Sequence, residues 1–332
     1  MKNIKFILLF LFTPLLMMAQ DQEEKAWYET GRVYGKIFSN VHYGLGETNQ
    51  KAFEVKRAYF GYQAKLDDHF SGNIKLDIGN QNDVQDYAAK KRFAYFKNAY
   101  VQYQLNGLKI QFGIADAFQF KTQEKFWGYR YIMQSFQDKN KFGSSADLGI
   151  FASYKFSKKL SLDISISNGE GYSNIQQDEY FKGSFGITYK PIKALVIRGY
   201  VDAHDSDEST QISANGFIGV TTTYFTLGNE FNYQANNKFH EDFDMYGLSF
   251  YSTVKIIDHL KAFGRYDYLS SNKLEGDDIP WNLAKDGSSI IAGLEYQPIK
   301  NVKMALNYQD FVAYASNGKD SHYLYFNVEL NF

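Results

Sequence analysis

Apolar and polar side chains alternate with a period of two along almost the whole chain after residue 30. In the segment 160–167, leucine or isoleucine occupies every even position, and serine or aspartate occupies every odd one. Successive side chains of a β-strand point to opposite faces, so this pattern predicts a strand with one apolar and one polar face. The pattern recurs at 57–66, 195–202, 302–309 and 325–332, and the chain is therefore predicted to be all-β.

Applied to the whole chain, the alternation predicts sixteen strands. The tenth is the least regular, because residues 216–224 alternate poorly. The predicted ranges are 33–43, 53–66, 70–79, 96–105, 108–115, 147–156, 159–168, 181–190, 193–203, 213–223, 224–234, 245–256, 259–269, 288–297, 301–311 and 322–332.

The connections between these ranges alternate between long and short. The odd-numbered connections have nine residues or more, and the even-numbered ones have three or fewer. Membrane β-barrels have this arrangement. Lipid offers no hydrogen-bond partners, and closing the sheet into a barrel pairs every backbone N–H and C=O group within the protein. The sequence therefore predicts a 16-stranded antiparallel transmembrane β-barrel with short periplasmic turns and long outer loops.

Residues 1–19 are predicted to be a secretory signal peptide. Lys2 and Lys5 precede an apolar run from Phe6 to Met18, and Ala19 stands before an acidic stretch. The run is shorter than the roughly 20 residues of a spanning helix, although an uncleaved anchor is the alternative. The barrel then occupies residues 20–332, and the protein is expected in a bacterial outer membrane.

Composition agrees with a barrel that faces lipid outside and water inside. The chain has 29 Phe and 27 Tyr, yet its mean hydropathy is −0.43. The aromatic residues can supply girdles at both membrane interfaces, while polar lumen residues lower the mean. The absence of cysteine excludes a disulfide scaffold and a thiolate site, and a net charge of −1 argues against a nucleic-acid partner.

The last strand ends in Phe332, with apolar Leu330, Val328 and Phe326 at alternate positions behind it. This segment resembles the terminal signal of outer-membrane proteins that the barrel-assembly machinery reads. The resemblance implies two partners, namely that machinery and outer-membrane lipid.

Several segments, in order, resemble the phosphate-selective porin O/P family. They are 55–66 with 73–79, 98–103 with 108–113, and 146–150 with 167–171, and their order and spacing match the family over roughly the first half of the mature chain. The resemblance implies a homotrimeric anion channel whose phosphate path is an arginine ladder with a lysine cluster. This chain has six arginines, too few for such a ladder, so the resemblance indicates ancestry rather than phosphate selectivity.

Alternation assigns more basic than acidic side chains to the lumen. The basic ones are Lys36, Arg57, Lys75, Lys109, Lys155, Lys182, Arg198, Lys261, Arg265 and Lys303, and the acidic ones are Asp77, Asp163, Asp202, Glu230, Asp267, Glu295 and Glu329. A charged lumen favours ions of the opposite sign, so a weak anion preference is expected, with Arg57, Lys75, Arg198 and Arg265 lining the pore. The alternative is that most of these charges pair across strands and only keep the wall solvated.

The third outer loop, residues 116–146, is expected to fold into the barrel and narrow it, as third outer loops of porins often do. Six aromatic residues fall within 118–131, a composition that disfavours disorder. Lys121, Lys125 and Arg130 are the expected solute contacts at this constriction. The alternative is a lid packed at the outer rim.

Acidic residues beside His204 and His240 raise two further alternatives, a divalent-cation site and hydrolysis at the outer rim. Neither spacing fits a known ligand motif, and the chain has no P-loop, dinucleotide-binding or GxSxG motif. No enzyme activity, cofactor or metal is therefore expected. The predicted function is passive diffusion of small anionic or neutral hydrophilic solutes, phosphate among them. The alternative is a non-conducting barrel with a structural or surface-binding role.

Overall fold

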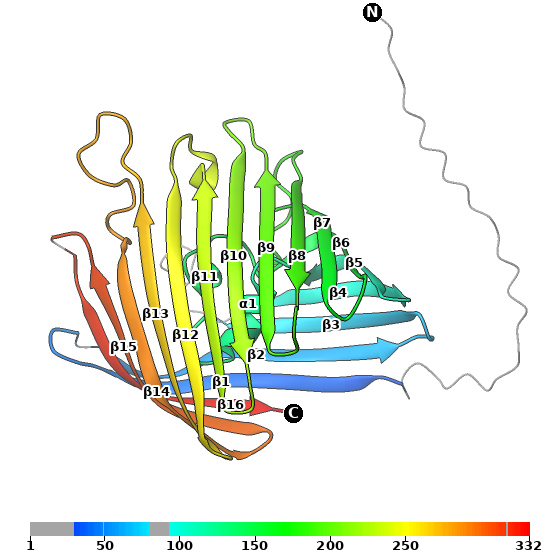
Figure 1. Cartoon of the computed structure of the whole chain (residues 1–332), viewed down its shortest axis with the longest axis horizontal. Coiled ribbons are helices and arrows are strands. Elements are labelled where there is room, and N and C mark those ends of the chain that lie inside the picture. The colour runs from blue at the N-terminus through cyan, green and yellow to red at the C-terminus, as the bar shows by residue number, and fades with distance from the viewer. Residues whose placement is uncertain (1–29, 49, 80–92, 317) are drawn as a thin grey trace, which may run out of the picture.

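The computed structural model describes residues 30–48, 50–79, 93–316 and 318–332 (Figure 1). Sixteen antiparallel strands of this part of the chain close into one barrel, in which every strand pairs with its neighbours in sequence and β1 pairs with β16. The predicted signal peptide lies outside the described residues. No described helix is long and apolar enough to cross a membrane.

The strands follow the alternation of the sequence closely. They are β1 (Arg32–Gly44), β2 (Lys51–Lys65), β3 (Phe70–Gly79), β4 (Phe93–Leu105), β5 (Leu108–Asp116), β6 (Ala146–Lys155), β7 (Leu160–Ser167), β8 (Lys182–Tyr189), β9 (Leu195–His204), β10 (Gln211–Thr221), β11 (Phe225–Ala235), β12 (Met245–Ile257), β13 (Leu260–Ser271), β14 (Gly287–Ile299), β15 (Val302–Ala313) and β16 (Ser321–Asn331). The sixteen-stranded barrel is confirmed, and so is the tenth strand.

The alternation of short and long connections holds, although its limits are looser than predicted. On one end, the turns run from two residues (106–107) to five (190–194). On the other end, the connections range from 45–50 to 117–145. The longest connection, 117–145, is called loop 3 below, and residues 168–181 are called loop 4. The two ends of the barrel are called the turn end and the loop end.

Each strand has one apolar outer face and one inner face, as β9 illustrates. The outward Ile197 and Val201 are 41% and 42% exposed, whereas the inward Arg198, Tyr200 and Asp202 are buried. The outer wall is therefore a continuous surface of exposed aliphatic and aromatic side chains. Such a surface is stable in lipid, whereas a soluble protein would have to cover it.

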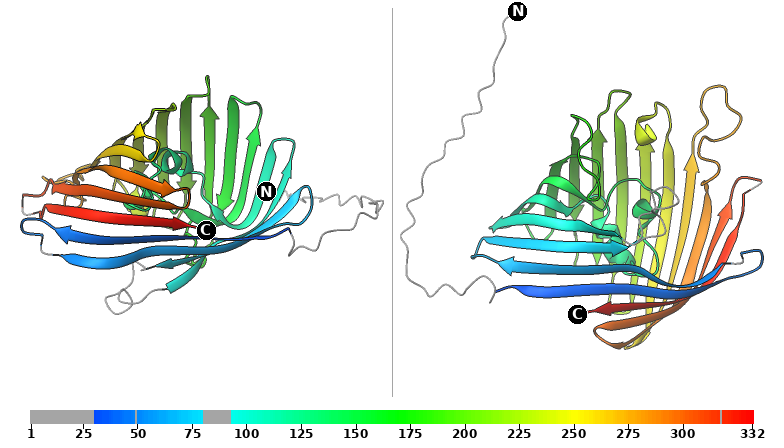
Figure 2. Two further views of the ribbon diagram at one scale, coloured as in Figure 1. Left: turned by 90° about the horizontal axis from the view of Figure 1, so that it is seen from below. Right: turned by 180° about the vertical axis from the view of Figure 1, so that it is seen from behind.

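The last residue helps to close the barrel. Backbone hydrogen bonds join Gly35 and Phe332 in both directions, at 2.9 and 3.0 Å. A side chain at Gly35 would collide with the Phe332 ring, so glycine lets the C-terminal aromatic residue lie flat on β1. Phe326 and Leu330 of β16 are exposed on the same outer face. Two further views show β1 and β16 side by side (Figure 2).

Two β-bulges break the alternation and add lysines to the lumen. The pairing of β1 with β2 passes from Arg57 to Val55, leaving Lys56 without a partner, and the pairing of β3 with β4 passes from Asn98 to Phe96, leaving Lys97 without one. An extra residue of this kind lets two consecutive side chains face the same side. Lys56 reaches loop 3, and Lys97 is 5% exposed.

Candidate functional site: a pore beside loop 3

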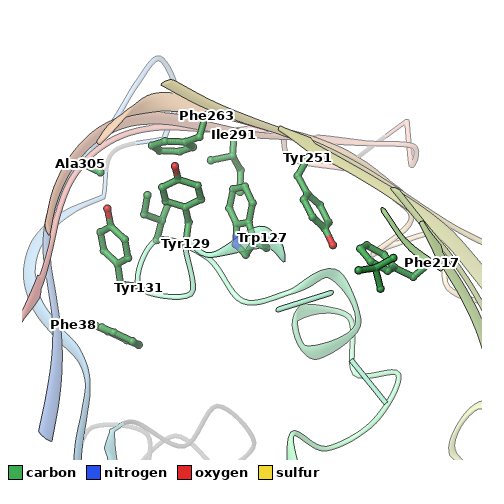
Figure 3. Packing of buried hydrophobic residues seen from close by; sticks show 11 residues of the cluster. Phe38, Trp127, Tyr129, Tyr131, Phe217, Tyr251, Phe263, Ile291 and Ala305 are labelled. Atoms are coloured by element: carbon green, nitrogen blue, oxygen red, sulfur yellow. The ribbon is translucent and has the colours of Figure 1, made fainter. Parts of the chain in front are cut away.

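Loop 3 lies inside the barrel, where it contains helices α1 (Lys121–Trp127) and α2 (Phe136–Lys139). Its aromatic side chains pack on the inner wall, and Figure 3 shows Tyr129 stacked under Phe263, with 4.3 Å between ring centroids. The cluster consists of Phe38, Trp127, Tyr129, Tyr131, Ile132, Val196, Phe217, Tyr251, Phe263, Ile291 and Ala305. Each large side chain buried here contributes roughly 1.5–3 kcal/mol, so one half of the lumen is a packed core.

Polar side chains of loop 3 are hydrogen-bonded to the same half of the wall. The Tyr131 hydroxyl donates to Glu295 Oε2 at 2.9 Å. Gln123 Nε2 donates to Asn215 Oδ1 at 3.0 Å, and Lys139 Nζ donates to Ser289 Oγ at 3.2 Å. Because buried polar groups are costly unless paired, these bonds fix the loop on this wall.

Two cavities lie beside loop 3, one toward each end of the barrel. Both border β2 to β4, and the one at the loop end also reaches His204 of β9 and Gln211 of β10. The loop-end cavity has a volume of about 370 Å³ and reaches from loop 4 past Arg57 and Asp77 to loop 3. The turn-end cavity has a volume of about 320 Å³ and is bordered by residues of β1 to β4 and by loop 3. Arg130 and Ser145 border both cavities, so the two cavities are neighbours at these residues, and this place is called the junction below.

Both loop cations at this junction are paired with carboxylates. Arg130 Nη2 lies 3.0 Å from Asp138, and Lys121 Nζ lies 3.3 Å from Asp116 and 3.6 Å from Glu124. Burial acts to lower the pKa of Lys121, but Asp116 and Glu124 outweigh burial and raise this pKa above its usual value. Lys121 therefore remains a cation at neutral pH.

Of the three predicted loop contacts, Lys121 and Arg130 lie together and Lys125 lies apart. Lys125 is exposed on α1 and borders a separate turn-end cavity of about 280 Å³ with Lys261 and Lys303. Lys125 is thus placed at the mouth of the barrel rather than at the junction. Of the predicted wall contacts, Arg57 borders the loop-end cavity, and Lys75 borders the turn-end cavity.

The remaining two predicted pore residues point inward but are covered by loop 3. Arg198 is 4% exposed and binds both oxygens of Asp163, at 2.6 and 2.8 Å. Arg265 is 3% exposed and binds both oxygens of Asp267 at 2.7 Å. Each arginine also donates to a loop 3 carbonyl, that of Phe118 or Gln134. These two arginines hold the loop in place and do not border either cavity.

Most of the lumen charges pair with one another, as one of the two sequence interpretations expected. The ion pairs are Lys36–Glu329, Arg57–Asp77, Lys182–Asp202, Arg198–Asp163, Lys261–Glu295, Arg265–Asp267 and Lys303–Glu329. Among the described residues, no group of three His, Asp or Glu side chains is placed to hold a metal ion.

Three residues of the site were not predicted. Lys56 donates to the carbonyl oxygen of Ile132 at 2.9 Å, and Lys97 donates to Ser145 Oγ. Tyr172 of loop 4 bonds to both Arg57 and Asp77. Strict alternation would put each lysine on the lipid face, opposite to its inward neighbour Arg57 or Asn98. An isolated cation is costly there, and that cost is the sequence signal that could have revealed the two bulges.

Solved structures that resemble this chain are outer-membrane barrels. The OmpF of Salmonella typhi, solved in complex with daunomycin, is 12% identical, with a TM-score of 0.70 over 92% of this chain and 99% of that one. The chain has a porin fold. The outer-membrane channel DcaP of Acinetobacter baumannii is 13% identical, with a TM-score of 0.67 over 91% of this chain and 97% of DcaP.

An anion-selective porin from Comamonas acidovorans is 10% identical, with a TM-score of 0.64 over 91% of this chain and 99% of that one. No family model matches the chain, and no curated protein matches it. At these identities the likeness concerns the fold alone. The resemblance to the phosphate-selective porin O/P family gains no further support from these comparisons.

Proposed function

We propose that this protein is a bacterial outer-membrane porin that lets small hydrophilic solutes diffuse passively, with a preference for anions. The observation that carries the proposal is that two cavities, one toward each end of the barrel, lie beside loop 3 and share Arg130 and Ser145 as lining residues. A solute would enter from the loop end, pass beside loop 3 and leave at the turn end, which faces the periplasm.

The charges of the turn-end cavity support the anion preference. Its basic side chains are Lys36, Lys75, Lys97, Lys121 and Arg130, and its acidic side chain is Glu124. Carboxylates pair with Lys36, Lys121 and Arg130, so the excess is smaller than this count. Inside a narrow space with walls of low dielectric, the remaining excess raises the local concentration of anions and lowers that of cations. At the periplasmic mouth, Lys125, Lys255, Lys261 and Lys303 border the third cavity together with one acid, Glu295, which pairs with Lys261.

The proposed mechanism involves no covalent chemistry. Solutes move down their gradient through a water-filled path, and wall charges bind them weakly enough to release them. Loop 3 sets the width of this path, because it fills the half of the lumen opposite the cavities. Catalysis and a cofactor have no part in the proposal.

Phosphate selectivity and a homotrimer are not part of the proposal. Of the six arginines, Arg198 and Arg265 are buried in ion pairs and cannot bind phosphate along the pore. If millimolar phosphate blocked the current, that result would nevertheless support the phosphate selectivity that the O/P resemblance implies. The oligomeric state is to be measured on the refolded protein.

A planar bilayer tests the proposal. The refolded full-length chain should give steady single-channel currents, and a salt gradient should give a reversal potential displaced toward that of the anion. Clear cation selectivity would contradict the anion preference. Folded protein without any conductance would support the second candidate, a non-conducting structural or surface-binding barrel, which is favoured by the tight packing of loop 3 on the wall.

A further inference from the structure

Loop 4 crosses part of the lumen at the loop end of the barrel. It connects β7 to β8, yet the hydroxyl group of its Tyr172 donates to Asp77 Oδ2 of β3 at 2.8 Å and accepts from Arg57 Nη1 of β2 at 3.2 Å. The strands β4, β5 and β6 separate β3 from β7 in the barrel. The loop therefore reaches from one part of the wall to another, and Tyr172 holds it there.

The contacts of Tyr172 explain why loop 4 keeps this position. Burial and the nearby Asp77 raise the pKa of Tyr172, so its hydroxyl group keeps the proton that it donates to the carboxylate. Hydrogen bonds that involve a charged partner are the stronger ones, and this hydroxyl group makes two of them. The ring also covers Lys97, with 3.9 Å between its centroid and Nζ. Tyr172 thus contacts β2, β3 and β4 at once.

Two glycines carry the chain inward to Tyr172. Gly169 and Gly171 have φ values of 98° and 83°, a region that L side chains rarely adopt. A side chain at Gly169 would collide with the His204 ring, and one at Gly171 would collide with Ser144 of loop 3. These glycines therefore let loop 4 turn into the lumen and lie directly against loop 3.

The segment 169–174, called the loop 4 lid below, lies along the loop-end cavity. Its residues that border this cavity are Gly169, Glu170, Tyr172, Ser173 and Asn174. The same cavity reaches Arg130 and Ser145 at the junction. A solute that takes the proposed path from the loop end therefore passes the loop 4 lid before it reaches the junction.

We infer that the loop 4 lid limits the size of the solutes that enter from the loop end, and that Tyr172 is the residue that holds the lid across the path. This inference rests on the proposed function, since a size limit has meaning only in a conducting barrel. A small hydrophilic solute passes beside the Tyr172 ring, whereas a larger one has to displace it. Displacement breaks the two hydrogen bonds of the hydroxyl group and leaves the ion pair of Arg57 with Asp77 in place.

Liposome swelling with neutral sugars measures this size limit separately from the effect of the wall charges. Tyr172→Ala should raise the swelling rate with a trisaccharide, relative to that with a monosaccharide, by about threefold or more, because the ring leaves the path. Tyr172→Phe keeps the ring but loses both hydrogen bonds, so it should raise the same ratio by less. Tyr180→Phe is the matched control in the same loop and should change nothing, because its hydroxyl group bonds to Asp207 at 2.7 Å and neither residue borders the cavity.

Thiol labelling detects the loop 4 lid in a barrel folded in detergent, whether or not the barrel conducts. The chain has no cysteine, and Ser144 lies against Gly171 and borders the loop-end cavity. Ser144→Cys should be labelled about threefold faster or more when it is combined with Tyr172→Phe, because the lid then opens more often. Its labelling rate should stay unchanged when it is combined with Tyr180→Phe.

Two results would overturn the inference. One is an unchanged labelling rate of Ser144→Cys in the presence of Tyr172→Phe, and the other is a wild-type size limit in both Tyr172 variants. Folded wild-type protein and variants without any conductance would instead overturn the proposed function. The labelling rate would then still show whether Tyr172 holds the lid, so the two failures can be told apart.

Discussion

The hydroxyl group of Tyr131, in loop 3, donates a 2.9 Å hydrogen bond to the carboxylate of Glu295 on β14. Glu295 is 2% exposed and also lies 3.3 Å from Lys261. This bond ties the loop to the far wall and so leaves the cavities on the side of β1 to β4. The position of the proposed pore follows from the side on which the loop is held.

Removing that hydroxyl should loosen the loop. Tyr131→Phe leaves one oxygen of buried Glu295 without its donor, which is expected to cost about 1–3 kcal/mol of unfolding free energy. Single-channel records should show more frequent flicker between conductance levels. Tyr154→Phe, on the exposed outer face, is the control. Wild-type noise and stability in Tyr131→Phe would show that the bond does not restrain the loop.

Deleting residues 121–141 should raise the single-channel conductance. The deletion removes both helices of loop 3 and its four residues in the packed cluster, Trp127, Tyr129, Tyr131 and Ile132, so the lumen widens. The measurement is a conductance histogram, with a deletion of the exposed loop residues 275–279 as the control. If the loop 3 deletion conducts like the wild type, loop 3 does not set the width of the path.

Arg198→Ala should destabilise the barrel and leave the selectivity unchanged. The substitution leaves Asp163 buried without its partner, at an expected cost of about 3–5 kcal/mol. The double variant Arg198→Met with Asp163→Leu should recover most of that stability, because it removes both charges. Urea unfolding measures the first effect and reversal potentials the second. A large change of ion selectivity in the double variant would show that Arg198 does contact the passing solutes.

Acid should strengthen the anion preference. Burial, with Asp178 and Asp147 nearby, raises the pKa of Glu170, which borders the loop-end cavity. As the pH falls through this raised pKa, above the usual 4.5, Glu170 loses its negative charge and the cavity becomes more cationic. Glu170→Gln should have the stronger preference at neutral pH and a weaker pH dependence. Identical pH profiles would exclude Glu170 from the path.

The strands could be predicted from sequence because lipid imposes one rule along the whole wall. A residue such as Ile197 must face outward, and its neighbour Arg198 must then face inward. The rule fails where the backbone departs from period two. The bulges at Lys56 and Lys97 depend on the register between strands, which a single sequence does not contain.

The pairing of lumen charges was also beyond the sequence. Arg198 and Asp163 lie on β9 and β7, which are not adjacent, and their side chains meet across Gly186 of β8, where any side chain would collide with both. Loop 3 covers some inward charges and leaves others in contact with water. Its packing depends on contacts with strands that are distant in sequence. Sequence could place Lys121 and Arg130 in the loop but not on the side that faces the cavities.

The central claim is that solutes pass the junction at Ser145, and cysteine modification of that residue tests it most directly. The chain has no cysteine, so Ser145→Cys offers a single target for thiol reagents. A small anionic thiosulfonate reagent, added from either side during recording, should reduce the current, and a cationic reagent of similar size should react more slowly. Ser213→Cys, buried against Gln234, should not respond. An unchanged current in Ser145→Cys, once labelling is verified, would contradict a path through this junction.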